Sequence, residues 1–240
     1  MPATPWSRPS NPSCGRRAAR ALAVAVPGAV ATLQQIQKHE QAHVDFLLAN
    51  GAVNDLNLTA ASFDFTGARG AGNGPFARAT TELQFLLLAA QAVEDTGVRA
   101  YKGQAGNLIS NKAVLEAALR IHSVEARHAA KIRRMRRQTN TSLTSVKYSG
   151  TITGGGAEAA GAGSISNPPA GAVAALGLIY GGATSEANTT QAGVNVATVS
   201  GSNLPSSVNQ AVAAQEAFDE PLTKAEVVAI VQGFFIPSLT

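Results

Sequence analysis

The fold is decided by two stretches of the sequence, HEQAHVDFL at residues 39–47 and IHSVEARHAAKIRRMR at residues 121–136. Each stretch contains a glutamate followed three residues later by a histidine, and these pairs are Glu40 with His43 and Glu125 with His128. Residues three apart in a helix lie one turn apart on the same face, so each pair directs a carboxylate and an imidazole the same way. All 4 histidines of the chain fall inside these two stretches. The pairing is therefore a repeated pattern.

Helical periodicity surrounds both stretches and recurs between them. The spacing of apolar residues predicts helices over about Val30–Asn50, Pro75–Gly103 and Asn111–Gln138. Asn111 is a plausible N-cap of the third. A short terminal helix is predicted at about 222–234, where Thr223 and Glu226 have the spacing of a capping box.

Three glutamates interrupt the apolar faces of these predicted helices. Glu40 shares its face with Leu33, Ile36, Val44 and Leu47; Glu94 with Leu83, Leu87, Ala90, Val98 and Tyr101; Glu125 with Val114, Ala118, Ile121 and Ile132. Burying an unpaired carboxylate costs several kcal/mol, and three that converge would also repel one another. A divalent metal would offset both costs, and carboxylate with imidazole suits iron, manganese or zinc better than calcium or magnesium.

These strings, together with AVEDTGVRAYKGQ at residues 92–104, closely resemble the ferritin-like domain family of bacterial, often exported, proteins. That family also includes plant and fungal desiccation-related proteins. The resemblance is strong over about residues 30–138, and weaker in NTTQAGVNV (188–196) and AFDEPLTKAEVVAI (217–230). It implies an all-α, ferritin-like helical bundle in which a Glu-x-x-His comes from each of two helices and a single Glu from each of the other two. It also implies iron or manganese as cofactor, with ligand roles for Glu40, His43, Glu94, Glu125 and His128.

The chain departs from the family pattern before Glu40. No Asp or Glu precedes that residue, and Pro27 breaks the preceding segment. We therefore expect a bundle that lacks a full first helix and holds five of the six family ligands. An absent helix would expose an apolar groove, which a second subunit or the C-terminal region could fill.

Composition divides the chain into three predicted parts. Residues 1–27 are expected to be a leader, with a disordered segment, a signal-like peptide and an incorrect translation start as alternatives. The family resemblance implies export, although this leader is not a clean signal peptide. Residues 28–139 form the predicted helical bundle. Residues 140–240 are predicted to be an irregular extension rich in Gly and Ala, with short strands near 145–153 and the terminal helix at its end.

The same residues allow several alternative functions. The chain could be a metal protein that oxidises ferrous iron or handles oxygen species, or a non-catalytic, stress-related bundle that has lost its metal. His39 and Glu40 with His43 also spell H-E-x-x-H, the signature of zinc hydrolases. A simpler alternative is that the Glu and His residues pair with each other or with Arg99 and Arg127.

Two classes of partner are not expected. The basic run at residues 127–137 ends a helix, where cations are favoured, and lacks the interleaved aromatics of a nucleic-acid surface. No apolar run reaches the roughly 20 residues that a membrane span needs. The partners that we expect are metal ions and a second copy of the chain.

Overall fold

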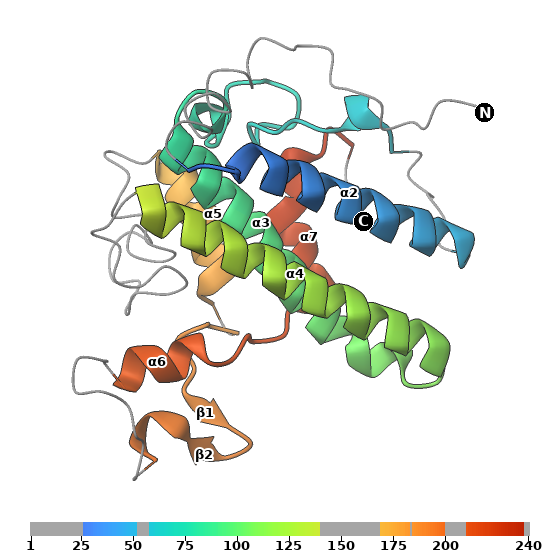
Figure 1. The fold of residues 1–240 in the computed structure, drawn as a ribbon, viewed down its shortest axis with the longest axis vertical. Coiled ribbons are helices and arrows are strands. Elements are labelled where there is room, and N and C mark those ends of the chain that lie inside the picture. The colour runs from blue at the N-terminus through green and yellow to red at the C-terminus, as the bar shows by residue number, and fades with distance from the viewer. Residues whose placement is uncertain (1–25, 52–57, 140–168, 183, 200–209, 238–240) are drawn as a thin grey trace. The chain divides into compact units, whose positions relative to one another are not determined.

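The computed structural model of the chain describes residues 26–51, 58–139, 169–182, 184–199 and 210–237. Helices dominate these residues, which confirms the predicted all-α class (Figure 1). The α-helices are α2 (Ala29–Ala49), α3 (Leu83–Gln104), α4 (Lys112–Thr139), α5 (Ala170–Tyr180), α6 (Gln210–Glu216) and α7 (Lys224–Val231). The 3₁₀ turns are η1 (Ala60–Ser62), η2 (Ala77–Thr80), η3 (Ala105–Leu108), η5 (Val196–Thr198) and η6 (Gln232–Phe234). Strands β1 (Thr190–Gln191) and β2 (Val194–Asn195) pair antiparallel. No helix within the described ranges is long and apolar enough to span a membrane.

Local sequence signals place most helix ends correctly. The Asn111 side chain accepts a hydrogen bond from the Val114 N–H at 3.2 Å, so it caps α4 as predicted. Thr223 and Glu226 form the predicted capping box at the start of α7, with Glu226 Oε2 accepting from the Thr223 N–H at 2.8 Å.

The second predicted helix begins later than expected. The segment after Pro75 forms the short turn η2, and α3 begins at Leu83. The Thr80 hydroxyl donates to the Ala77 carbonyl at 2.8 Å, and the Thr81 hydroxyl contacts the Arg78 carbonyl. Threonine side chains that bond nearby backbone in this way compete with helix formation, which explains the delayed start.

The predicted irregular extension, residues 140–240, contains two helices that the sequence did not indicate. Helix α5 occupies 170–180 and helix α6 occupies 210–216. The sequence of α5, AGAVAALGLIY, is apolar on every side, so no polar face revealed its 3.6-residue period. Its residues Leu176 and Tyr180 are fully buried, so this segment belongs to the core.

Other expectations fall outside the described residues. These are the missing first helix and most of the leader at 1–27, and the short strands near 145–153.

The chain divides into two compact units that interleave along the sequence. The first comprises Met1–Ala89 with Val231–Thr240, and the second comprises Ala90–Ile230. In the first unit, the end of the chain returns to the loop that follows α2. Phe63 forms a bridge with Phe235, and the Asp64 N–H donates to the Phe234 carbonyl at 2.8 Å.

The loop of the first unit is organised around the carboxylate of Asp64, which is 7% exposed. Its Oδ1 accepts from the Thr66 N–H at 2.9 Å and from the Thr66 hydroxyl at 2.6 Å. Its Oδ2 accepts backbone N–H bonds from Ala68, Gly70 and Gly72. Burial opposes ionisation of this group, but the hydrogen bonds from Thr66, Gly70 and Gly72 outweigh it and lower the pKa of Asp64 to about 2.

This lowered pKa predicts acid sensitivity of the loop. Because the folded pKa lies below the ordinary value of 3.8, ionised Asp64 stabilises the fold at neutral pH by about 2 kcal/mol. That contribution is fully present above pH ~4 and is lost as the pH falls through ~2. We expect Asp64→Asn to lower the free energy of unfolding at pH 7, and the difference from wild type to shrink between pH 4 and pH 2. Urea unfolding of both proteins across this range measures it, and a difference that does not change with pH would contradict the assignment.

The second unit is built on α4 and on the part of α3 that begins at Ala90, and these two helices run antiparallel. Side-chain contacts show this: His122 Nδ1 lies 3.0 Å from the Val98 carbonyl, whereas Arg136, four turns further along α4, donates to Gln91 at 2.7 Å. Helix α5 meets α3 through the Tyr180 hydroxyl, which donates to Asp95 at 2.7 Å. The predicted ligands Glu94, Glu125 and His128 lie between these contacts, near the middle of both helices.

Candidate metal site

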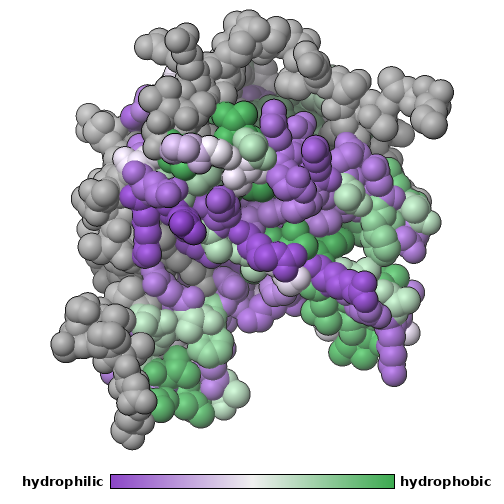
Figure 2. All heavy atoms as spheres, in the orientation of Figure 1, coloured by the Kyte–Doolittle hydropathy of each residue, from purple (hydrophilic) through white to green (hydrophobic). Residues whose placement is uncertain are grey.

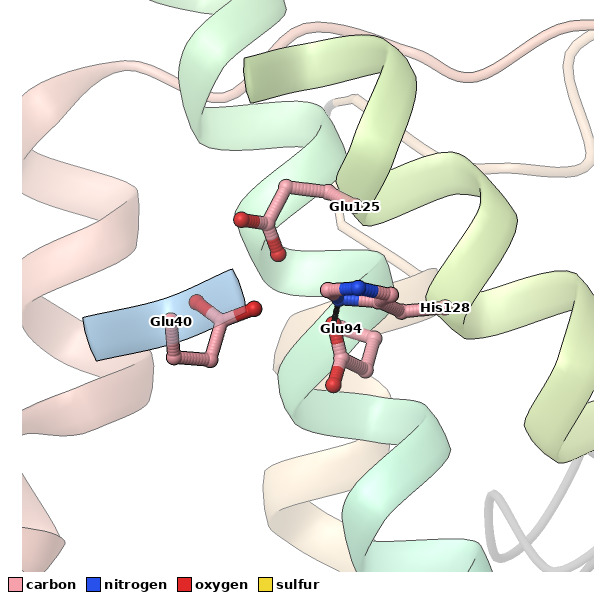
Figure 3. A group of neighbouring side chains, drawn as sticks. All are labelled: Glu40, Glu94, Glu125 and His128. Carbon is pink, nitrogen blue, oxygen red and sulfur yellow. Dashed lines mark hydrogen bonds and ion pairs between the residues drawn. The ribbon is translucent and has the colours of Figure 1, made fainter. Parts of the chain in front are cut away.

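Three of the predicted ligands come together between α3 and α4. Glu94 lies on α3, and Glu125 and His128 lie one turn apart on α4 (Figure 3). One potential ligand atom from each residue lies within 4.8 Å of those of the other two. His128 Nδ1 is 3.2 Å from Glu94 Oε2. These residues, which the helical spacing singled out, therefore lie close together in the second unit.

All three side chains are withdrawn from solvent. The exposed fractions are 8% for Glu94, 6% for Glu125 and 5% for His128. Leu87, Val98, Ile121 and Ile132, on the same predicted faces of α3 and α4, are also buried. Two carboxylates held this close in an apolar setting repel each other, and the repulsion is weakly screened. The set of donors, two carboxylates and one imidazole, fits a divalent transition metal, which would neutralise that charge.

A buried polar network supports the same stretch of α3. Asp95, the neighbour of Glu94, accepts from the Tyr180 hydroxyl at 2.7 Å and from Arg133 at 2.6 Å. Burial, reinforced by the Asp95 charge, raises the pKa of Tyr180 well above its ordinary value. The hydroxyl therefore stays protonated and acts as a donor. No sequence signal pointed to Tyr180, because it lies 85 residues from Asp95 in the chain.

Arg99 anchors α3 to a different segment. Asp95 and Arg99 are one turn apart on α3, but Asp95 pairs with Arg133 and Arg99 pairs with Glu186. Arg99 Nε lies 3.0 Å from Glu186 Oε1, and both side chains are fully buried. Arg99 also donates to the carbonyl of Glu220 at 2.7 Å, and to those of Ile179 and Thr184. A tertiary partner of this kind cannot be found by helical spacing.

The other predicted half-site lies in the first unit. Glu40 and His43 are one turn apart on α2, with Glu40 Oε2 3.4 Å from His43 Nδ1. The two remaining histidines make other contacts. His39 Nε2 lies 2.7 Å from the Gln35 amide nitrogen, and His122 contacts the Val98 carbonyl.

The basic run at the end of α4 is divided between solvent and core. Arg127, Lys131 and Arg134 are exposed, and hydrophilic side chains line this helix in Figure 2. Arg136, in the same run, is fully buried and donates to Gln91. Burial lowers the pKa of Arg136 to about 10.

We compared the sequence with known protein families, curated proteins and solved structures. The sequence model of the ferritin-like domain family matches residues 16–138. This match covers both Glu-x-x-His pairs and Glu94, and it begins upstream of residues 30–138, where the sequence resembles the family most strongly. Searches of curated proteins and of solved structures gave no match. The matched segment exceeds half of the 240 residues, and the chain belongs to the ferritin-like domain family.

Proposed function

We propose that this protein binds iron or manganese through Glu94, Glu125 and His128. The observation that carries the proposal is the burial of two carboxylates and an imidazole with ligand atoms within 4.8 Å of one another. We assign the same role to Glu40 and His43 because they repeat the Glu-x-x-His spacing and lie inside the family match. Hard cations such as Ca²⁺ take oxygen ligands only, whereas the imidazole of His128 favours a transition metal.

The chemistry that such a metal would supply is electron transfer to oxygen species, with oxidation of ferrous iron as the main candidate. The protein's own contribution is to hold the ligands. Helices α3 and α4 fix the backbone of all three residues, and the contact between His128 Nδ1 and Glu94 orients the imidazole. The apolar residues on the same faces limit access of water to the site.

Metal-dependent stabilisation tests the proposal. When the free metal concentration is 100 times the Kd, binding to the folded state stabilises it by about 2.7 kcal/mol. For a chain of this size, that corresponds to a rise in Tm of about 5–10 °C. We expect this rise with Fe²⁺ or Mn²⁺ under nitrogen, and a much smaller one with Mg²⁺.

The control is the double variant Glu94→Ala/His128→Ala, which should show no rise with any of these ions. If the wild-type protein neither gains stability nor retains iron or manganese, the proposal is wrong. The non-catalytic, stress-related bundle is then the better description of this chain.

A further inference from the structure

Helix α3 contains a glycine, Gly97, in its interior, one turn after Glu94. Glycine is less favourable than alanine in a helix because it loses more backbone entropy on folding. Its usual justification is a left-handed backbone, but Gly97 is not among the glycines with positive φ. Backbone conformation therefore does not require glycine at this position.

The space beside Gly97 is occupied by the carboxylate of Glu125. A Cβ placed on Gly97 would lie 2.9 Å from Glu125 Oε2, 3.3 Å from its Cδ and 3.6 Å from its Cγ. The first of these distances is shorter than real Cβ contacts allow. The carboxylate of a proposed ligand thus lies directly against the bare Cα of α3.

Gly103, about two turns further along α3, is a glycine whose Cβ would meet backbone and not a side chain. A Cβ there would overlap the backbone carbonyl oxygen of Leu222. The Leu222 N–H donates to the Arg99 carbonyl on α3, so this backbone cannot move without breaking that hydrogen bond. At Gly97 the obstacle is the end of a flexible side chain. Alanine at 97 would therefore move the Glu125 carboxylate and leave the backbone in place.

We infer that Gly97 is a positioning residue of the metal site. The missing side chain leaves the space through which Glu125, on α4, reaches Glu94 and His128. This inference rests on the proposed function, because it assigns Gly97 a role through a ligand of that site. It requires that Gly97→Ala weakens metal binding while the fold persists.

The test compares Gly97→Ala with Gly177→Ala in the full chain. Gly177 is a matched control because it is also helical, on α5, and its Cβ would meet no atom within 4 Å. We expect Gly97→Ala to bind Fe²⁺ or Mn²⁺ about 10- to 100-fold more weakly than wild type, with a Tm in the absence of metal that is not lowered. The visible spectrum of bound Co²⁺ should change, because it reports ligand geometry. Gly177→Ala should match wild type in both affinity and spectrum.

A double-mutant cycle with Glu125→Ala tests whether Gly97 acts through Glu125. Without metal, removing the Glu125 side chain removes the obstacle, so alanine at 97 should raise Tm more in that background than in wild type. An equal change in both backgrounds would overturn the inference, as would unaltered metal affinity of Gly97→Ala. If wild-type protein binds no metal, the proposed function fails and the inference falls with it. The two failures are distinguished by the wild-type titration.

Discussion

Glu125→Gln is expected to weaken metal binding strongly and to stabilise the metal-free protein at the same time. Glutamine keeps the size of the side chain but removes its charge and replaces one of its two oxygens with an NH2 group, which does not bind a cation. Glu125 is 6% exposed and its ligand atom lies within 4.8 Å of that of Glu94. Without metal, the two carboxylates repel each other, so neutralising one relieves a repulsion on the order of 1–3 kcal/mol. With metal, the same change should weaken binding by at least about 100-fold.

The two opposite effects make this variant informative. Tm without metal and Fe²⁺ affinity are both measured under nitrogen at pH 8, where free imidazole is neutral. Glu116→Gln is the matched control, because Glu116 lies on the same helix, is 64% exposed in its side chain and pairs with Arg120. It should change neither quantity by much. A Glu125→Gln protein that is less stable and binds metal normally would show that Glu125 serves the fold and not the site.

Glu186→Ala is expected to have the largest effect on stability. It leaves the guanidinium of Arg99, which is fully buried, without the carboxylate that lies 3.0 Å from its Nε. Removing one partner of a buried ion pair costs about 3–5 kcal/mol, because the other charge stays desolvated. Glu186 Oε1 also accepts from the Glu220 N–H at 2.6 Å, and that bond is lost as well. A fall in Tm of about 10 °C is expected.

The comparison for this effect is Glu82→Ala, which breaks a pair that is partly exposed to water. Glu82 has a side chain that is 46% exposed and lies 2.7 Å from Arg78 Nε. Water solvates either partner when the other is removed, so the cost should be below about 1 kcal/mol. Thermal unfolding of both variants without metal gives the two values. Similar small losses in both would contradict the importance of the Arg99–Glu186 pair.

Features encoded by neighbouring residues could be predicted from the sequence. Helices α2 and α4 have clear apolar faces, and the caps at Asn111 and Thr223 depend on residues three apart. The juxtaposition of Glu94, Glu125 and His128 could also be predicted, because a carboxylate on an apolar face has to meet something that compensates it.

What could not be predicted depends on tertiary contacts. Helix α5 has no polar face, so its sequence shows no helical period. Only the folded second unit shows which of its residues are buried. Tyr180 and Glu186 find their partners on α3, more than 80 residues earlier in the chain. The role of Gly97 is likewise defined by what α4 places beside it. None of these pairings leaves a local pattern in the sequence.

The most direct test of the metal site is anomalous X-ray diffraction at the iron edge from crystals of the full chain loaded with Fe²⁺ under nitrogen. The proposed function predicts an anomalous peak at bonding distance from the carboxylates of Glu94 and Glu125 and from the imidazole of His128. The peak should be absent from Glu94→Ala/His128→Ala crystals treated in the same way. Wild-type crystals with no peak there, or with iron bound only elsewhere, would contradict the assignment of these three residues as metal ligands.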